Sequence, residues 1–237
     1  MIVLGIETST ARSSVALLID GTVVAHEHHE DARGHGAFLA PAMRRCLDAA
    51  PHTAGAAQVD GIAVGTGPGL YTGLRVGMAT TGAFAAARGV PVVGVSGMDA
   101  LALAAGVVQG SVVTTLDARR GQVFWAVHGP ADGGRSSIRR GDPTVGTVEE
   151  LDERLEILAE DGPVHVVGEI GAPMVTRPDA ADTARLALAV LAATPHDELT
   201  ADRLVPVYLR DADVRIGWAV RGGARGGVDR VPDGSGA

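Results

Sequence analysis

The sequence predicts an α/β protein in which one structural unit is used twice. Residues 2–6 form an apolar run of strand length, which leads through Glu7 and a short polar loop to a second apolar run at 15–19. The same order returns at 111–127, where the carboxylate is Asp117. Helical spacing of apolar residues between these units predicts helices that alternate with short buried strands, as α/β folds require.

The chain opens with three consecutive strands. Strands at 2–6 and 15–19 are followed by Asp20-Gly21, a dipeptide that tolerates the positive φ angles of a two-residue hairpin turn. A returning strand at 22–28 completes the β-β-β arrangement.

Helices and strands then alternate through the rest of the first half. A helix is predicted at 37–50, with Pro41 in its first turns, where a missing amide costs least. A strand at 61–64 leads through a glycine-rich loop into a helix at 72–88, which Gly89 ends as a C′ residue. The remaining elements expected here are a strand at 90–95 and a helix at 98–105.

The second half repeats the strand, tight loop and strand over 111–116, 117–121 and 122–127. Residues 129–148 are expected to be rich in loops. The elements predicted after them are an acidic helix at 149–160, a strand at 164–167, a helix at 180–193 and a closing segment at 204–209.

Composition excludes several chemistries. All 20 basic residues are arginine, so a P-loop lysine, a Schiff-base lysine and a kinase-type lysine are impossible. The formal charge of −8 argues against a broad basic face for nucleic acid. One cysteine, Cys46, fits a reducing compartment and lies on the apolar stripe of its helix as a small hydrophobe. Without a signal peptide or a membrane-spanning run, we expect a cytoplasmic protein.

The glycine loop 65–73 matches neither specific nucleotide motif. The last position of G-x-G-x-x-G is not glycine from either Gly65 or Gly67, and a Walker loop needs a lysine. Two interpretations remain: an anion site at the N-terminus of the following helix, or glycines that allow tight turns and close packing. The helix 72–88 is itself rich in glycine and alanine, which predicts close approach either to the sheet or to another subunit.

Other candidate sites are weaker. Glu7 and Asp117 each follow a strand, and in a two-lobed fold they could share a cleft as metal-coordinating carboxylates, although Arg119 and Arg120 crowd the second loop. The histidines at 26, 28, 29 and 35 lack the spacing of a metal site and fit a solvated strand end better. Two RGG tripeptides at 221–227 have a composition typical of RNA-contacting segments, but two copies in a neutral tail favour an inert tail.

Five segments, in the right order, resemble the signature of the bacterial TsaB proteins, formerly YeaZ. The most specific is GTGPGLYTGLRVG (65–77). The others are GIETST (5–10), RGVPVVGVSGMDALA (88–102), LDARRGQVF (116–124) and PVYLR (206–210).

The resemblance implies an actin-like fold (ASKHA, RNase H-like) of two duplicated lobes. The expected divisions are an N-terminal lobe at 1–105, a C-terminal lobe at 106–215 and a Gly/Arg-rich tail at 216–237. Between 168 and 178 the chain is shorter than the family pattern, so we expect a trimmed second lobe.

The resemblance also implies a function in making N6-threonylcarbamoyladenosine in tRNA. TsaB is a non-catalytic relative of the transferase TsaD, with which it pairs, and the ATPase TsaE joins them. We therefore expect no cofactor on this chain, with ATP and a metal ion used by the other subunits. Contact with tRNA is expected only through partners, and the isolated chain could form a homodimer.

Site residues follow from the same resemblance. The helices 37–50 and 72–88 correspond to the dimer-forming helix pair of the family. The expected interface residues are Leu39, Met43, Leu47, Leu70, Tyr71, Thr72, Gly73, Leu74, Gly77, Met78 and Thr81. The expected degenerate nucleotide cleft consists of Glu7, Thr8, Ser9, Thr10, Asp117 and Arg119, and no catalytic or metal-binding residue is expected. The alternative is an active small-molecule kinase or ATPase of the actin-like superfold.

Overall fold

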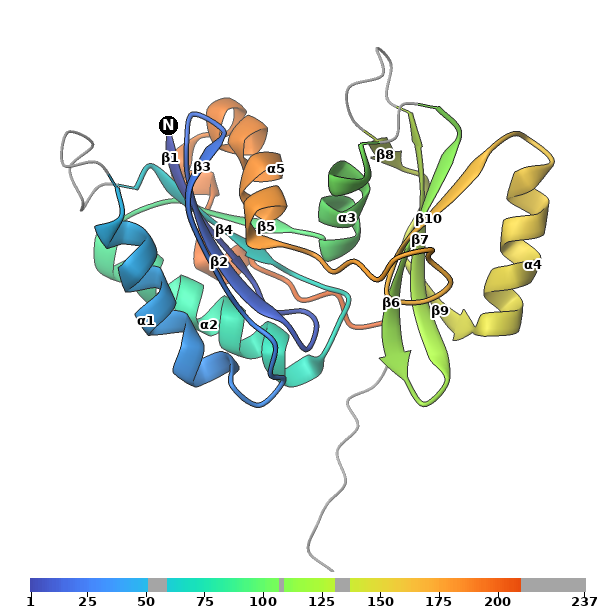
Figure 1. Cartoon of the computed structure of the whole chain (residues 1–237). Helices are drawn as coiled ribbons and strands as arrows, with labels where there is room; N and C mark the ends of the chain where they lie inside the picture. Colours follow the sequence, from blue (N-terminus) through green and yellow to red (C-terminus); the bar gives the residue numbers. More distant parts are fainter. Residues whose placement is uncertain (51–58, 107–108, 131–136, 210–237) are drawn as a thin grey trace, which may run out of the picture.

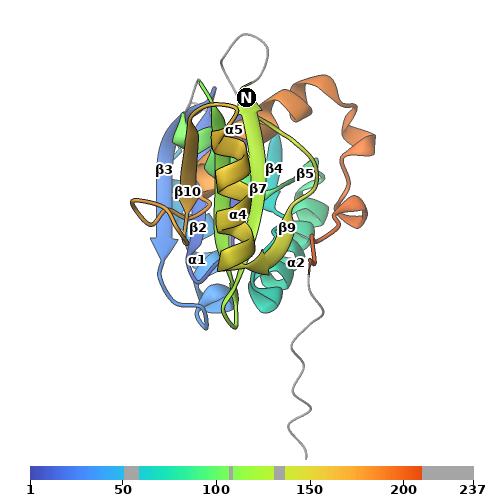
Figure 2. The same cartoon turned by 90° about the vertical axis from the view of Figure 1, so that its right-hand side faces the viewer.

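Two β-sheets face each other across a set of helices in the computed structural model of the chain (Figure 1). The structure describes residues 1–50, 59–106, 109–130 and 137–209. Figure 2 shows the second sheet and its outer helix from the side. The expected α/β fold, with two sheets built on the same strand unit, is confirmed.

The first sheet has the strand order β3-β2-β1-β4-β5. The meander β1 (Ile2–Glu7), β2 (Ser13–Ile19) and β3 (Thr22–His29) is antiparallel, with Asp20 and Gly21 at φ of 50° and 80° in its tight turn. On the other side of β1, β4 (Gly61–Gly65) and β5 (Val92–Val95) are parallel. The predicted β-β-β opening is therefore confirmed.

Helices cover both faces of this sheet. The helices α1 (His35–Asp48) and α2 (Tyr71–Arg88) pack on one face, and α5 (Ala180–Ala193) packs on the other (Figure 1). Because alternate strand residues point to opposite faces, Leu4 and Ile6 join the core under α1, whereas Val3 joins the core under α5.

The second sheet repeats this plan. The hairpin β6 (Ser111–Arg119) and β7 (Gln122–Pro130) is antiparallel, and β10 (Val164–Gly168) pairs with β6 in parallel, as β4 does with β1. The short strands β8 (Ser137–Arg139) and β9 (Thr144–Thr147) pair with β7. The helix α3 (Gly97–Ala105) packs on one face, and α4 (Val148–Ala159) packs on the other.

The two halves of the sequence exchange helices. The helix α3 belongs to the predicted range 1–105 but packs against β6, β8 and β10, whereas α5 belongs to 106–215 but packs against the first sheet. The predicted ranges 1–105 and 106–215 therefore divide the sequence but not the packing. Each range contributes one helix to the lobe that the other range mainly forms. This exchange fixes the position of the loops between the lobes.

Two local predictions need correction. The region 129–148 is not mainly loop, because the end of β7 and the strands β8 and β9 lie there. The predicted loop 117–121 is shorter, because β6 continues to Arg119 and the chain reverses over Arg119, Arg120 and Gly121, all with positive φ. Alternating hydrophobicity is weak in such short edge strands, so periodicity alone does not reveal them.

The remaining segments lie at the end of the described chain. After α5, two 3₁₀ turns, His196–Glu198 and Ala201–Arg203, lead to residues 204–209, where the Val207 amide donates to the Thr66 carbonyl at 2.8 Å. The predicted tail at 216–237 lies outside the described residues. No helix within the described ranges is long and apolar enough to cross a membrane.

Candidate functional site

The first half of the loop between β1 and β2 is buried inside the first lobe. Glu7 and Thr8 have no exposed surface, and Ser9 and Thr10 are almost as deeply buried. The Ser9 amide donates a 2.7 Å hydrogen bond to Oε1 of Glu7. The Thr183 hydroxyl, on α5, donates to Oε2 of the same carboxylate at 3.4 Å. The Glu7 carboxylate therefore binds groups of its own chain.

The glycine loop after β4 lies directly on this segment. The Leu70 amide donates to the Ser9 carbonyl at 2.7 Å. A Cβ on Gly69 would overlap that carbonyl, and a Cβ on Gly65 would overlap the Glu7 carboxylate. These glycines are required for close internal packing, which agrees with the second of the two sequence interpretations.

Burial also sets the electrostatics of Glu7. Desolvation raises its pKa above the ordinary value, the Asp179 charge adds to this effect, and the bonds from Ser9 and Thr8 oppose it. A carboxylate held in this state is a poor ligand for a solvated cation, because it is neither exposed nor readily ionised.

The second predicted carboxylate, Asp117, has a different environment. It accepts hydrogen bonds from the Arg119 amide at 2.7 Å and from the Arg119 guanidinium at 3.0 Å. Its own amide donates to Oε2 of Glu169 at 3.0 Å. Asp117 and Glu7 thus belong to separate hydrogen-bonded groups, one at the surface of the second sheet and one in the interior of the first lobe.

The histidines are divided among several roles. His26 contacts the Asp179 carboxylate through Nε2 at 3.0 Å, and His29 stacks on Phe38. His35 is buried against the Ser13 hydroxyl, and desolvation lowers its pKa. Across the described ranges, no three His, Cys, Asp or Glu side chains are grouped as metal ligands.

Two glycines of α2, Gly73 and Gly77, have a packing role within the chain. A Cβ on Gly73 would overlap the Thr8 carbonyl, and a Cβ on Gly77 would overlap the Thr8 hydroxyl. That hydroxyl donates to the Gly73 carbonyl at 2.8 Å. The two glycines therefore let α2 approach the loop after β1.

Most of the predicted interface residues are buried inside the first lobe. The buried members are Leu39, Met43, Leu47, Gly73, Leu74, Gly77 and Thr81. The members with accessible surface are Leu70, Tyr71, Thr72 and Met78. The four accessible residues have surface with which a partner can make direct contact. The seven buried residues pack inside the lobe, beneath the outer surface of the helix pair.

The outer surface of the helix pair carries a set of small side chains beside charged ones such as Arg44, Arg45 and Arg75. We call it the α1–α2 face; its exposed small residues are Gly36, Ala37, Ala40 and Pro41 of α1 with Ala79, Ala83 and Ala86 of α2. The two helices lie side by side on the same face of the sheet (Figure 1). The sequence predicted close approach along the helix 72–88 from its glycine and alanine content, but the expected interface residues include none of these seven.

An aromatic cluster lies where α2 begins. The Arg75 guanidinium lies 3.9 Å from the centre of the Tyr71 ring and donates to the Tyr208 hydroxyl at 3.1 Å. The Tyr71 and Tyr208 ring centres are 5.0 Å apart. Both tyrosines occur in segments of the family signature, GTGPGLYTGLRVG and PVYLR, but their contact spans a separation that sequence does not reveal.

These features define a class: a two-sheet α/β protein with a repeated strand unit, whose loop after β1 is bonded to its own carboxylate and whose helix pair presents small side chains. Comparison with known proteins agrees with this class. The sequence model of TsaD, tRNA N6-adenosine threonylcarbamoyltransferase, matches residues 22–140. An uncharacterized protein of Mycobacterium tuberculosis is 33% identical over 215 residues, covering 90% of this chain and 93% of that protein.

Named relatives and solved structures point the same way. The tRNA threonylcarbamoyladenosine biosynthesis protein TsaB of Bacillus subtilis is 28% identical over 235 residues, covering 92% of this chain and 98% of that protein. YeaZ from Pseudomonas aeruginosa superposes with a TM-score of 0.67 at 28% identity, over 88% of this chain and 99% of that one. The chain spans 56% of a longer Mycobacterium leprae relative that is 32% identical.

The chain belongs to the TsaB/YeaZ-like proteins of the TsaD family.

Proposed function

We propose that this chain is a non-catalytic subunit in the synthesis of N6-threonylcarbamoyladenosine in tRNA, where it binds and activates TsaD through its α1–α2 face. The observation that carries the proposal is the hydrogen bond from the Ser9 amide to the buried Glu7 carboxylate. Proteins of the actin-like fold hold phosphates with backbone loops and carboxylates. In this chain one such amide and one such carboxylate satisfy each other.

The second loop supports the same conclusion. Asp117 is paired with Arg119, whose guanidinium lies beside the carboxylate that a metal ion would need. Arg119 and Arg120 also have positive φ, so two large side chains occupy the tight turn. The paired carboxylate and the crowded turn favour a degenerate nucleotide cleft over an active phosphotransfer site.

The α1–α2 face supports the docking part of the proposal. Small side chains let the backbones of two helix pairs approach closely, which increases dispersion contact over the whole helix length. The neighbouring cluster of Tyr71, Arg75 and Tyr208 has the residue types that dominate binding energy at protein interfaces. We place TsaD on this surface, and the same surface is available for a homodimer of the isolated chain.

The remaining chemistry belongs to the partners. ATP and a metal ion act on the other subunits, TsaE joins the complex, and tRNA contacts the chain indirectly. The formal charge of −8 supports this division, because a phosphate backbone binds clustered positive charge.

A reconstitution experiment tests the proposal. TsaD and TsaE from the same organism are assayed for tRNA modification with and without this chain, and ATP hydrolysis by the isolated chain is measured in parallel. The proposal predicts that modification requires this chain, while the isolated chain hydrolyses no ATP above background. Robust turnover that Glu7→Ala abolishes would instead establish the kinase or ATPase alternative.

A further inference from the structure

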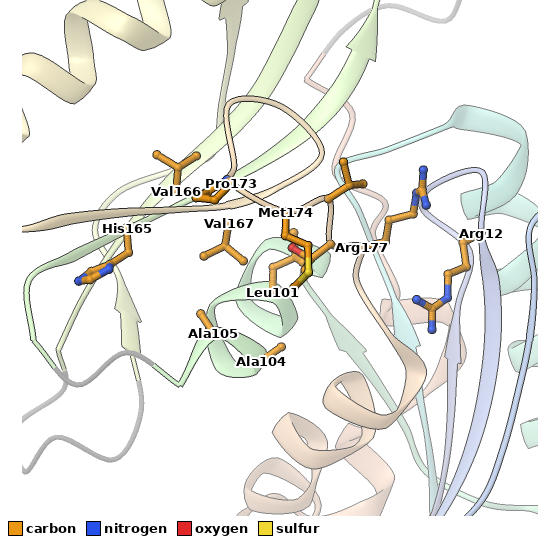
Figure 3. A pocket seen from close by; sticks show the side chains of 12 residues that line it. Arg12, Leu101, Ala104, Ala105, His165, Val166, Val167, Pro173, Met174 and Arg177 are labelled. Atoms are coloured by element: carbon orange, nitrogen blue, oxygen red, sulfur yellow. The ribbon is translucent and has the colours of Figure 1, made fainter.

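A cavity of about 560 Å³ lies between α3, β10 and residues 173–177 (Figure 3). Its volume is in the range of ligand and peptide pockets. Neither Glu7 nor any residue of the α1–α2 face lines it, so the proposed function assigns no role to it. Arg12 and Arg177 lie toward one end, and His165 lies at the other.

The cavity runs along the edge of β10. Three consecutive strand residues, 165–167, line it. Because alternate side chains of a strand point to opposite faces, three in a row can line one cavity only along the strand's edge. In Figure 3, Val167 projects toward α3 while Val166 lies on the other side of the strand.

This edge is open for most of its length. Within the described part of the chain, β10 pairs with β6 alone and is the outermost strand of its sheet. At its C-terminal end, Gly168 forms an isolated parallel bridge with Val175, and the Thr176 amide donates to the Gly168 carbonyl at 2.9 Å. The edge therefore already accepts one residue of a neighbouring strand.

The walls of the cavity are aliphatic. Leu101, Ala104 and Ala105 of α3 form one side, and Val167 faces them. At the rim, Met174 and Val175 are 73% and 58% exposed. Large exposed apolar side chains beside an open strand edge are typical of a surface that another chain covers.

The polar end favours a neutral or basic group over an anion. The Arg12 guanidinium pairs with Asp179 and Glu30, and the Arg177 guanidinium pairs with Glu169 and Glu30. Two cations thus face three carboxylates. The excess of carboxylates over guanidinium groups disfavours an anion, whereas it tolerates a neutral peptide group or a basic side chain.

We propose that the edge of β10 binds an extended, uncharged or basic peptide segment of a partner protein. The segment adds a strand to the second sheet and places an aliphatic side chain in the cavity beside α3. Its backbone supplies hydrogen bonds along the edge, and the cavity selects the side chain.

A titration of the intact, ¹⁵N-labelled chain tests this assignment. The probe is a hexapeptide with acetyl and amide ends, in which valine alternates with threonine and one arginine provides solubility. Two further versions carry N-methyl groups on alternate amides, one version for each edge of the peptide strand. Binding is followed through the backbone amides of β10 and residues 173–177.

Strand addition predicts that the unmethylated peptide shifts these amides saturably and that only one methylated version still binds. Ala104→Trp, at an exposed position on the cavity wall, is expected to weaken binding at least tenfold. The matched control Ala192→Trp, on the exposed side of α5, should leave binding unchanged.

Three outcomes would overturn the proposal. The first is the absence of saturable shifts with the unmethylated peptide at millimolar concentration. The second is equal binding by both methylated versions, which would make the cavity a simple apolar pocket. The third is shifts of the β10 amides with protein concentration alone, which would assign the edge to a second copy of the chain.

Discussion

The backbone amide of Ser9 donates a 2.7 Å hydrogen bond to the carboxylate of Glu7, two residues earlier in the chain. The bond closes the loop after β1 on itself, and the Gly65–Leu70 segment then covers it. Glu7 and this loop hold four residues of the nucleotide cleft that the sequence resemblance implies, Glu7 to Thr10. Glu7 is therefore a structural acid in this chain, and its substitution should affect stability before it affects any chemistry.

Replacing Glu7 by glutamine should change how stability depends on pH. Because burial raises the Glu7 pKa above 4.5, its contribution is fully present below about pH 4.5 and is lost as the pH rises through the folded-state pKa. Glutamine has no such loss. Urea unfolding of both proteins from pH 4 to pH 8 should show the difference shifting in favour of Glu7→Gln as the pH rises. Burial lowers the pKa of His35, but His35 is present in both proteins, so its contribution to the pH dependence cancels in the difference. Parallel stability curves would contradict the assignment.

The contact between Thr8 and Gly77 predicts a coupled pair of substitutions. Gly77→Ala places a methyl group on the Thr8 hydroxyl and should lower the free energy of unfolding by about 1–3 kcal/mol. Thr8→Ala removes that hydroxyl and the bond to the Gly73 carbonyl. The double variant should be more stable than the sum of the single effects, because the overlap is gone. Strict additivity in denaturant unfolding would mean that the two side chains do not meet.

Cys46 should be chemically inert in the folded protein. It is 1% exposed, its thiol faces the Val15 carbonyl at 3.6 Å, and burial raises its pKa from 9.0 to about 11. At pH 8 the thiolate population is lower by about a hundredfold than in the unfolded chain, in addition to the loss of access. Reaction with a disulfide reagent should therefore be at least a hundredfold slower before urea unfolding than after it. Comparable rates would place the thiol at the surface.

Sequence patterns predicted the fold well because its main elements are long and periodic. The apolar stripe from Leu39 to Leu47 and the runs on either side of Asp20-Gly21 each satisfy a local rule that the structure confirms. The strands β8 and β9 were missed because they are short and lie at the side of a sheet, where pairing with β7 decides their conformation.

The site was predicted less completely, for a different physical reason. The resemblance named Leu74 and Thr81, which are buried, whereas the small residues that the sequence also marked on this helix include the exposed Ala79 and Ala83; the sequence alone does not tell which small residues face outward. The contact of Arg75 with Tyr208 and the pairing of Arg12 with Asp179 span most of the chain, and no local pattern encodes such pairs.

The accessible surface of α2 offers the most direct test of the proposed function. Ala83→Arg places a long charged side chain on the α1–α2 face without entering the core, so the free energy of unfolding should change by about 0.5 kcal/mol or less. Ala192→Arg, on the exposed side of α5, is the matched control on the opposite side of the first sheet.

Association with TsaD and tRNA modification by the reconstituted complex should be measured together for the original chain and both variants. The account predicts that Ala83→Arg weakens association at least tenfold and lowers modification in proportion, whereas Ala192→Arg matches the original chain. Unchanged association and modification with a folded Ala83→Arg protein would contradict the claim that TsaD binds the α1–α2 face.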